Sequence, residues 1–192
     1  MVTTRNSRDD VVRAAGRLFA ERGYHGTSMR DLGKELGMLG SSLYSHVSSK
    51  QDLLVEVVEE GARLFEPSAA QALAAGGSPA ERLDALVAGH VEVVVDNIEV
   101  ARTFLNEARM LDSRHRRRVL AARDHYEAVF RGVVLAGVGD GTFRAGFDEK
   151  MAAIYILSVL NAVERWYDPA GELDRDALVE SLCSFVSAAL AT

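Results

Sequence analysis

TSMRDLGKELGMLGSSLYSHVSSK, residues 27–50, is the stretch that decides the fold of this chain. It predicts two short helices joined by a tight turn, followed by the start of a third helix. Thr27 or Ser28 is a suitable N-cap, because a hydroxyl there can accept a hydrogen bond from an unpaired helix N–H. An apolar or closely packed stripe recurs at helical spacing at Met29, Leu32, Gly33 and Leu36. Gly37 is expected to end this helix, because glycine readily adopts the left-handed conformation found at helix ends.

The segment after the turn has the character of a DNA-reading helix. Leu43 and Val47 are expected to face inward and anchor it. Its other positions are small or hydrogen-bonding, which suits a helix face that enters a major groove. These candidate DNA-facing residues are Gly40, Ser41, Ser42, Tyr44, Ser45 and His46. The whole stretch therefore predicts a helix-turn-helix.

The order of these elements, with GSSLYSHVSSKQDLL at residues 40–54, resembles the DNA-binding domain of the TetR family of bacterial repressors. FAERGYHGTS at residues 19–28 is similar to the sequence that leads into that domain. The likeness covers roughly the first 55 residues. One departure is Val47, which stands where the family usually has Phe, and another is the unusually small reading surface at residues 40–42.

The resemblance implies a homodimer that binds a pseudo-palindromic DNA duplex. It places Gly40, Ser41 and Ser42 near base edges, within a DNA-binding set completed by Thr27, Ser28, Tyr44, Ser45, His46 and Lys50. Of these, the residues expected to bond phosphates are Thr27, Tyr44, His46 and Lys50.

Composition indicates a globular all-α protein. The chain has 192 residues, of which 48% are hydrophobic and 26% charged, with three Pro. It contains no apolar run long enough to cross a bilayer and no signal-peptide pattern, so we expect no membrane partner and a cytoplasmic location. Cys183 is the single cysteine, which fits a reducing compartment.

Charge is distributed unevenly along the chain. Residues 1–50 hold eight Lys or Arg and five Asp or Glu, a net charge of +3. The remainder of the chain has a net charge of −9, so the whole chain carries −6. A cationic N-terminal part on an anionic body is expected when one end of a protein meets phosphates. Binding through so few cations should depend strongly on salt.

Helix start and stop patterns predict about nine helices and a division into a DNA-binding domain, residues 1–50, and a ligand-binding and dimerisation domain, residues 51–192. Outside the helix-turn-helix, the expected helices cover about 7–22, 49 to Pro67 or beyond, 78–97, 100–110, 113–136, 148–166 and 174–190. Gly137 is expected to end the 113–136 helix, and Pro67 to kink or end its own. The family resemblance implies that the last two helices form a four-helix dimer interface.

The chain offers no pattern typical of catalysis, a cofactor or a metal site. GVGDG at residues 137–141 follows a helix instead of a strand, so it predicts a helix cap and loop and not a nucleotide site. The five His residues, at positions 25, 46, 90, 115 and 125, have no partners at ligand spacing. We therefore expect no metal, no cofactor and no enzymatic activity.

RHRRR at residues 114–118 is the densest cationic run, and it lies in the first turn of a predicted helix, where the helix dipole disfavours positive charge. One interpretation is a solvated face partly paired with Glu107 or Asp112. The other is a site for the phosphates of a ligand.

FLNEARML at residues 104–111 and NAVERWYDPAG at 161–171 are similar to a TetR-family branch that senses acyl-coenzyme A thioesters of fatty, aromatic or steroid catabolism. This likeness implies a tunnel for the acyl group and basic residues for the coenzyme phosphates. The candidate pocket residues are Phe104, Arg109, Tyr126, Tyr155, Asn161, Arg165 and Trp166. Several of them are alternatively expected to face the dimer interface.

These observations predict a TetR-like repressor of a catabolic or lipid-metabolism operon. A small hydrophobic effector is expected to release it from its operator, and the best candidate for that effector is an acyl-CoA thioester. One alternative is a regulator of an efflux gene that senses hydrophobic drugs or free lipids. The other is a ligand-binding or enzymatic helical module with an incidental three-helix head.

Overall fold

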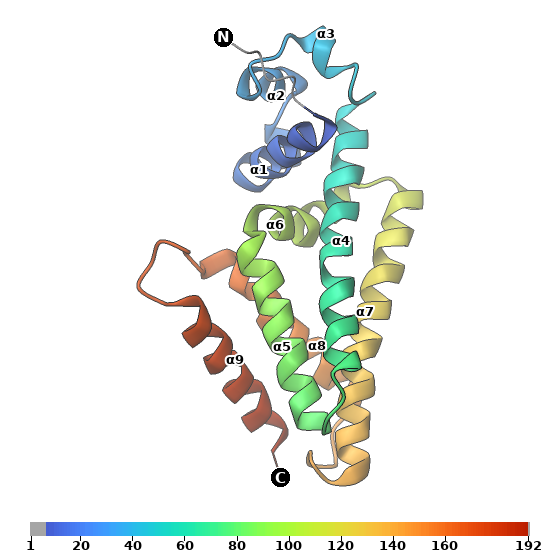
Figure 1. Cartoon of the computed structure of the whole chain (residues 1–192). Coiled ribbons are helices and arrows are strands. Elements are labelled where there is room, and N and C mark those ends of the chain that lie inside the picture. Colours follow the sequence, from blue (N-terminus) through green and yellow to red (C-terminus); the bar gives the residue numbers. More distant parts are fainter. Residues whose placement is uncertain (1–6, 192) are drawn as a thin grey trace. The chain divides into compact units, whose positions relative to one another are not determined.

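The computed structural model describes residues 7–191, except for the side chains of Gly40 and Ser41. Within that range the chain contains nine α-helices, one short 3-10 helix and no strand, which confirms the predicted all-α class (Figure 1). The elements are α1 (Arg8–Gly26), α2 (Met29–Glu35), α3 (Gly40–Leu43), α4 (Lys50–Ala74), α5 (Pro79–Asp96), α6 (Ile98–Glu107), η1 (Ala108–Met110), α7 (Ser113–Asp140), α8 (Glu149–Trp166) and α9 (Arg175–Leu190). Among the described helices, none combines the length and apolar character needed to span a bilayer.

The helices form two compact units. The head unit comprises Met1–Ala62 and Glu99–Val119, and the body unit comprises Arg63–Ile98 and Leu120–Thr192. α4 and α7 contribute to both units, and α6 and η1 group with the N-terminal helices. The expected division at residue 50 remains a prediction about domain organisation.

α1 forms as its local sequence predicts. Ser7 caps it, with its hydroxyl accepting from Asp10 N–H at 3.2 Å and its own N–H donating to the Asp10 carboxylate at 2.8 Å. Gly23 is non-helical (φ 73°), so the regular helix stops there, and one further turn reaches Gly26. The predicted stripe is buried at Val11, Ala14, Ala15, Leu18 and Phe19.

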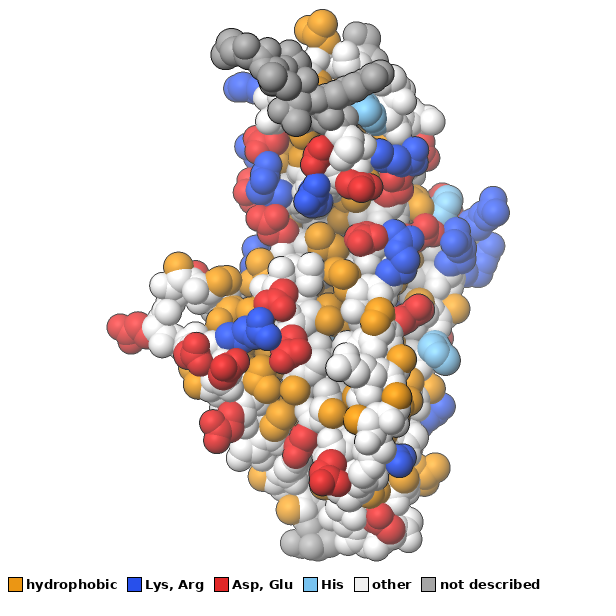
Figure 2. Space-filling model, viewed as in Figure 1, with side chains coloured by type: hydrophobic (Ala, Val, Ile, Leu, Met, Phe, Trp, Pro, Cys, Tyr) orange, Lys and Arg blue, Asp and Glu red, His pale blue; other side chains and the backbone are white. Residues whose placement is uncertain are grey.

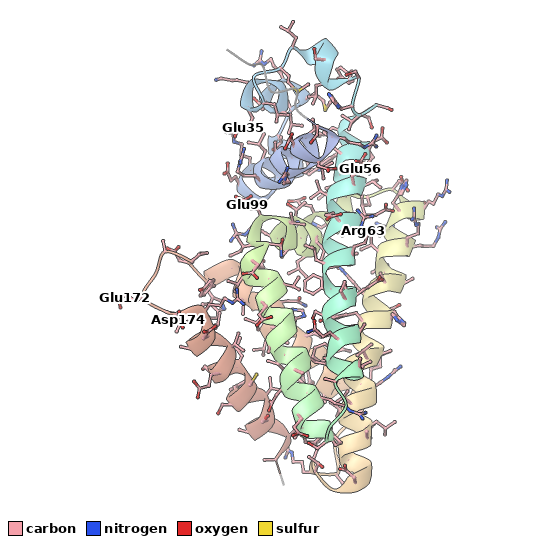
Figure 3. All side chains as sticks on the ribbon, in the orientation of Figure 1. Glu35, Glu56, Arg63, Glu99, Glu172 and Asp174 are labelled. Carbon is pink, nitrogen blue, oxygen red and sulfur yellow. The ribbon has the colours of Figure 1, made fainter. Side chains whose placement is uncertain are left out.

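Within the head unit, α6 packs tightly against α1 and α4. Thr103 of α6 is fully buried, and its hydroxyl donates to the Gly16 carbonyl of α1 at 3.0 Å. A Cβ atom added at Gly61 of α4 would lie 2.6 Å from the Cβ of Phe104, so α4 and α6 approach closely only because this position is glycine. Ion pairs of Arg8 with Glu56 and of Arg17 with Glu35 tie α1 to α4 and to α2; both carboxylates are labelled in Figure 3.

In the body unit, α5 packs against α8 and α9. α5 begins as predicted at a capping box between Ser78 and Glu81. The hydroxyl of Ser187 on α9 donates to the Asp84 carboxylate of α5 at 3.1 Å. At the other end of the same pair, the Arg175 guanidinium bonds Asp96 at 2.9 Å.

Two expected helix ends differ from the structure. Pro67 does not end its helix: α4 continues through it to Ala74, with Ala69 and Ala72 buried in the turns that follow, and the alternative of a kink stays a prediction. α7 continues past Gly137 to Asp140, because Gly137 serves close packing and not a cap. A Cβ atom at Gly137 would lie 2.2 Å from the ring of Phe143, which folds back over the helix.

Candidate nucleic-acid interface and effector site

α2 begins at Ser28, which decides between the two predicted caps. The Ser28 hydroxyl accepts from Asp31 N–H at 3.1 Å, and Ser28 N–H donates to the Asp31 carboxylate at 2.9 Å. The hydrogen bonds from Ser28 lower the pKa of the Asp31 carboxyl below its ordinary value. The negative charge therefore stays at the N-terminus of α2, where the helix dipole favours it.

Thr27 is used inside the head. Its side chain is 1% exposed, and the hydroxyl hydrogen is shared between the carbonyls of Leu18 and Gly23, each at 3.1 Å. The structure thus leaves the predicted phosphate-bonding hydroxyl of Thr27 no exposed surface.

The turn after α2 closes through two glycines. Gly37 takes the predicted left-handed conformation (φ 62°). Met38 N–H donates to the Gly33 carbonyl at 2.8 Å, and a Cβ atom at Gly33 would lie only 3.1 Å from the Met38 carbonyl oxygen. Gly33 therefore favours the close approach of the turn to α2, because a larger residue would push the Met38 carbonyl away by a few tenths of an ångström.

α3 presents a polar surface above a buried anchor. Leu43 and Val47 are 0% and 4% exposed, which confirms their predicted inward direction. Ser42 and Ser45 are exposed, and the Ser45 hydroxyl donates to the Ser42 carbonyl at 2.6 Å. Tyr44 is 55% exposed.

His46, by contrast, is half-buried. The side chains of Gly40 and Ser41 lie outside the described residues, so their predicted approach to base edges stays a prediction.

Lys50 closes the head from the first turn of α4. Its ammonium donates to the carbonyls of Tyr24 at 2.7 Å and of Thr27 at 2.8 Å, and it lies 4.1 Å from the centre of the Tyr24 ring. Tyr24 in turn donates its hydroxyl to Gln51 at 2.9 Å, and the Gln51 amide donates to the Met110 carbonyl of η1 at 3.3 Å. An ammonium has three N–H groups, so Lys50 has one left for a phosphate.

A hollow of about 650 Å³ lies over α2 and the start of α3. Its lining residues are Met29, Arg30, Asp31, Gly33, Lys34, Met38, Leu39 and Tyr44. Arg30 and Lys34 are exposed, and neither forms an ion pair within the described part of the chain. This combination of free cations and exposed hydroxyls can bind phosphates and base edges.

The body unit encloses a second candidate site, a polar cluster among aromatic rings. His90 is 2% exposed, and its Nδ1 lies 3.2 Å from the Tyr126 hydroxyl. Burial lowers the pKa of His90 to about 3, and the side chain of Asn161 acts weakly in the opposite direction. The ring is therefore neutral near pH 7. Its Nε2 atom is buried without a hydrogen-bond partner of ordinary geometry.

The rest of this cluster comes from α4 and α7. Burial raises the pKa of Tyr126 well above its ordinary value, and the Ser68 hydroxyl opposes that shift. The Ser68 Oγ, which would lie 2.6 Å from a Cβ atom at Gly89, is also buried without a partner of ordinary geometry. Phe65 packs its ring 4.9 Å from that of His90. We call His90, Tyr126, Ser68 and Asn161 the buried polar cluster.

The structure brings together only two of the seven predicted pocket residues, Tyr126 and Asn161. Phe104 is buried in the head unit, where Arg109 is exposed on η1. The remaining three lie at the surface of α8: Tyr155 (63% exposed), Trp166 (54% exposed) and Arg165. His90, Ser68 and Phe65 were not predicted as site residues, although His90 stands in the apolar stripe of α5. A lone polar residue in such a stripe was the signal that could have identified it.

α8 and α9 expose an apolar surface. They line a groove of about 490 Å³ whose exposed residues include Met151 (39%), Tyr155 (63%) and Phe185 (59%). Buried neighbours such as Val186 continue the same surface inward. We call Met151, Tyr155 and Phe185 the α8/α9 patch.

The basic run at the start of α7 is partly neutralised. The Asp112 carboxylate accepts from the N–H groups of Arg114 at 2.8 Å and His115 at 3.0 Å, and hydrogen bonds from His115 and Arg114 lower its pKa to about 2. Of the two acidic partners offered for this run, Glu107 or Asp112, the structure shows Asp112, whose carboxylate lies 2.6 Å from His115 Nδ1. Arg118 pairs instead with Glu59 at 2.9 Å.

Arg114, Arg116 and Arg117 are exposed and form no ion pair within residues 7–191; Figure 2 shows the basic side chains gathered at the start of α7. Within the same described range, no group of three or more His, Cys, Asp or Glu side chains is arranged to hold a metal ion.

The exposed reading segment, the cationic hollow and the separate helical body define a DNA-binding regulator. Residues 11–57 match the family of bacterial regulatory proteins named tetR, and residues 76–190 match the tetracyclin repressor-like C-terminal domain. The chain belongs to the TetR family of bacterial transcriptional regulators. This match confirms the resemblance of the sequence to the TetR family. The family is one of transcriptional regulators and not of enzymes.

Similar proteins cover nearly the whole chain. The HTH-type transcriptional repressor KstR2 of Rhodococcus jostii (strain RHA1) is 28% identical over 186 residues, which are 96% of this chain and 91% of that protein. The ketosteroid transcriptional regulator KstR2 of Mycobacterium tuberculosis shares the fold with a TM-score of 0.91 at 23% identity, covering 97% of this chain and 96% of that one. AibR, solved in complex with isovaleryl coenzyme A and operator DNA, shares it with a TM-score of 0.84 at 23% identity, covering 93% and 96%.

Proposed function

We propose that this protein is a homodimeric repressor that binds operator DNA through its head units and is released when an acyl-CoA thioester binds its body unit. The observation that carries the proposal is the α2–α3 geometry. Ser28 and Gly37 place an exposed polar segment beside a cationic hollow, as a major-groove reader requires. Near relatives named as repressors support the direction of regulation.

The DNA contacts follow from exposure. Ser42 would donate to a phosphate or base edge, and Tyr44 and His46 to phosphates, with Gly40 and Ser41 closest to the bases. The Ser45 hydroxyl, whose hydrogen is donated to the Ser42 carbonyl, would accept from a base-edge donor. Ser28 would contribute at the start of α2. Lys50 would use its remaining N–H, whereas Thr27 would act through the position of its backbone.

Tyr44→Phe tests this interface, because it removes one hydroxyl and keeps the ring. Loss of one hydrogen bond to a charged phosphate should weaken operator affinity about tenfold. Binding is measured by mobility shift on a duplex enriched from random DNA by the purified protein. Thr142→Val is the control, because it removes an exposed hydroxyl of the body unit outside the α8/α9 patch, and it should leave affinity unchanged. If the wild-type protein selects no sequence from the random pool, even at low salt, the repressor proposal is wrong.

Dimerisation is proposed through the α8/α9 patch. Three large apolar side chains exposed together favour an interface over a solvated surface. Phe185→Glu would place a charge in that interface and should give a monomer by analytical ultracentrifugation at micromolar concentration. A wild-type monomer at that concentration would contradict this part of the proposal.

Effector binding is proposed at the buried polar cluster. Its aromatic rings suit an apolar group, and His90 Nε2 and Ser68 Oγ, which lack a hydrogen bond of ordinary geometry, suit a ligand oxygen. An acyl-CoA complex of the similarly folded AibR supports this ligand class. Arg114, Arg116 and Arg117, which group with the head unit, stay a candidate site from the sequence for the phosphates of a ligand. Arg109, Arg165, Phe104, Tyr155 and Trp166 stay candidates from the sequence.

Calorimetry with an acyl-CoA, the free acid and a hydrophobic drug separates the effector classes. We expect the wild-type protein to bind only the thioester, and the His90→Phe variant to bind that thioester more weakly than the wild type does. Equal binding of the free acid would favour a lipid sensor, and binding of the drug alone would favour an efflux regulator.

Release from DNA would follow from a population shift between a DNA-binding and a non-binding conformation. An effector shifts that equilibrium only by the difference between its affinities for the two conformations.

A further inference from the structure

The residue immediately before α3 is an exposed leucine, Leu39. Leu39 is 77% exposed, and its carbonyl accepts from the N–H groups of Ser42 at 2.9 Å and Leu43 at 3.1 Å, which starts α3. Ser, Thr, Asp or Asn usually occupies such a position, because its side-chain oxygen can cap the helix. A leucine side chain provides no cap, so its presence does not stabilise α3.

The backbone holds Leu39 at the tip of the turn. The left-handed Gly37 and the close contact of Met38 with Gly33 fix the chain immediately before it. Leu43 fills the buried position beneath α3. The Leu39 side chain is consequently directed toward solvent on the face that would approach DNA.

Its surroundings favour a nucleic-acid partner. Among the described residues of the head unit, Leu39 and Tyr44 are the large hydrophobic side chains that are strongly exposed, and both line the cationic hollow. Arg30 and Lys34 line the same hollow and form no ion pair there. The acidic residue that lines the hollow is Asp31, and its carboxylate accepts a hydrogen bond from Ser28 at the cap of α2. An apolar side chain beside free cations suits a ligand that has a methyl group close to phosphates.

We propose that Leu39 contacts the C5-methyl group of a thymine in the major groove and so contributes to operator selectivity. Thymine is the base that presents a methyl group in the major groove, and apolar side chains recognise it by contact. Arg30 and Lys34 attract the flanking phosphates, while the hydroxyls of α3 hydrogen-bond elsewhere. This inference rests on the proposed binding of operator DNA.

The test is a double-mutant cycle between protein and DNA. In the duplex enriched from random DNA by the full-length protein, each thymine is replaced in turn by deoxyuridine, which lacks only the methyl group. Wild-type protein should bind about fourfold more weakly when the contacted thymine of one half-site is replaced, the effect of exposing one methyl group. Leu39→Ala should bind the thymine duplex more weakly and should no longer distinguish thymine from uracil at that position.

Leu135→Ala is the matched control, because Leu135 is 56% exposed on α7 in the body unit. It should retain the full response to uracil. If Leu39→Ala and wild type respond equally to uracil at every position, the inference is overturned while DNA binding stands. If the wild type selects no sequence, the proposed function fails and the inference fails with it. A purely structural effect of Leu39→Ala would weaken all duplexes equally and would also overturn the inference.

Discussion

Lys50→Met should make part of the head unit open more often, although lysines in DNA-binding heads are usually interpreted as phosphate ligands. The ammonium of Lys50 donates to two carbonyls at the end of α1, at 2.7 and 2.8 Å, and lies over the Tyr24 ring. Methionine keeps most of the aliphatic stem and removes the charge, so the change tests the polar contacts and not the packing.

The expected cost is about 2–3 kcal/mol. Hydrogen bonds to charged groups contribute about 1.5–3 kcal/mol each when buried, and less here because Lys50 is only half-buried. The cation–π contact adds about 0.5–1 kcal/mol. Since 1.4 kcal/mol is a factor of ten, 2 kcal/mol corresponds to roughly 30-fold more frequent opening of this region.

Native-state hydrogen exchange of the segment 24–36 is the suitable assay, because it measures local opening. Fluorescence of Trp166 would report on the body unit instead. Lys34→Met is the matched control, because Lys34 is exposed and forms no ion pair within the described residues. It should leave exchange unchanged and lower the salt dependence of DNA binding by about one phosphate contact.

Equal exchange in Lys50→Met and Lys34→Met would refute this reasoning. It would show that the carbonyl contacts of Lys50 are replaced by water without loss. Lys50 would then be an ordinary surface cation available to DNA.

Three further outcomes follow from the structure. Gly137→Ala should lower the thermal midpoint by several degrees, because its Cβ would clash with Phe143 at 2.2 Å, whereas Gly139→Ala, with no atom within 4 Å, should be neutral or slightly stabilising. Thr103→Val should cost about 1 kcal/mol in urea unfolding monitored by circular dichroism, because it removes a buried hydrogen bond to the Gly16 carbonyl of α1; no loss would contradict the bond. For His90 the folded pKa of about 3 lies below the ordinary 6.5, so the unfolded chain binds the extra proton, and stability should fall as pH drops from 6.5 toward 3. His90→Gln should flatten that dependence by up to about 1.4 kcal/mol per pH unit, and an unchanged slope would place the ring in water.

Local chemistry made the helix starts predictable. The caps at Ser7, Ser78, Asp148 and Asp174 use a side chain and N–H groups within three residues, so neighbouring sequence is sufficient to identify them. The left-handed Gly37 was predictable for the same reason. The family resemblance extended these local features to a helix-turn-helix, and the family comparison confirmed it.

The helix ends and several candidate site residues were less predictable. Pro67 and Gly137 are helix breakers by propensity, but tertiary packing retains them inside α4 and α7. Lys50 carries a charge that suits DNA, yet two of its donors bond carbonyls 26 and 23 residues away in sequence. No local pattern encodes those distances.

The candidate effector site shows the same limit. Helical spacing could place Tyr126 and Asn161 on inward faces, but it could not distinguish them from Tyr155 and Trp166, which lie at the surface. The role of His90, on α5, depends on residues from three other helices, α4, α7 and α8, that surround its ring.

Sequence alone determined the all-α class, the caps, the turn glycine and the charge contrast between the two ends, because each is set by neighbouring residues or by composition. Tertiary structure alone decided that Thr27 and Lys50 bond within the head, that His90 is neutral and buried, and that Leu39 stays exposed. Burial and hydrogen bonding depend on chain segments far apart in sequence, and these meet only when the helices pack.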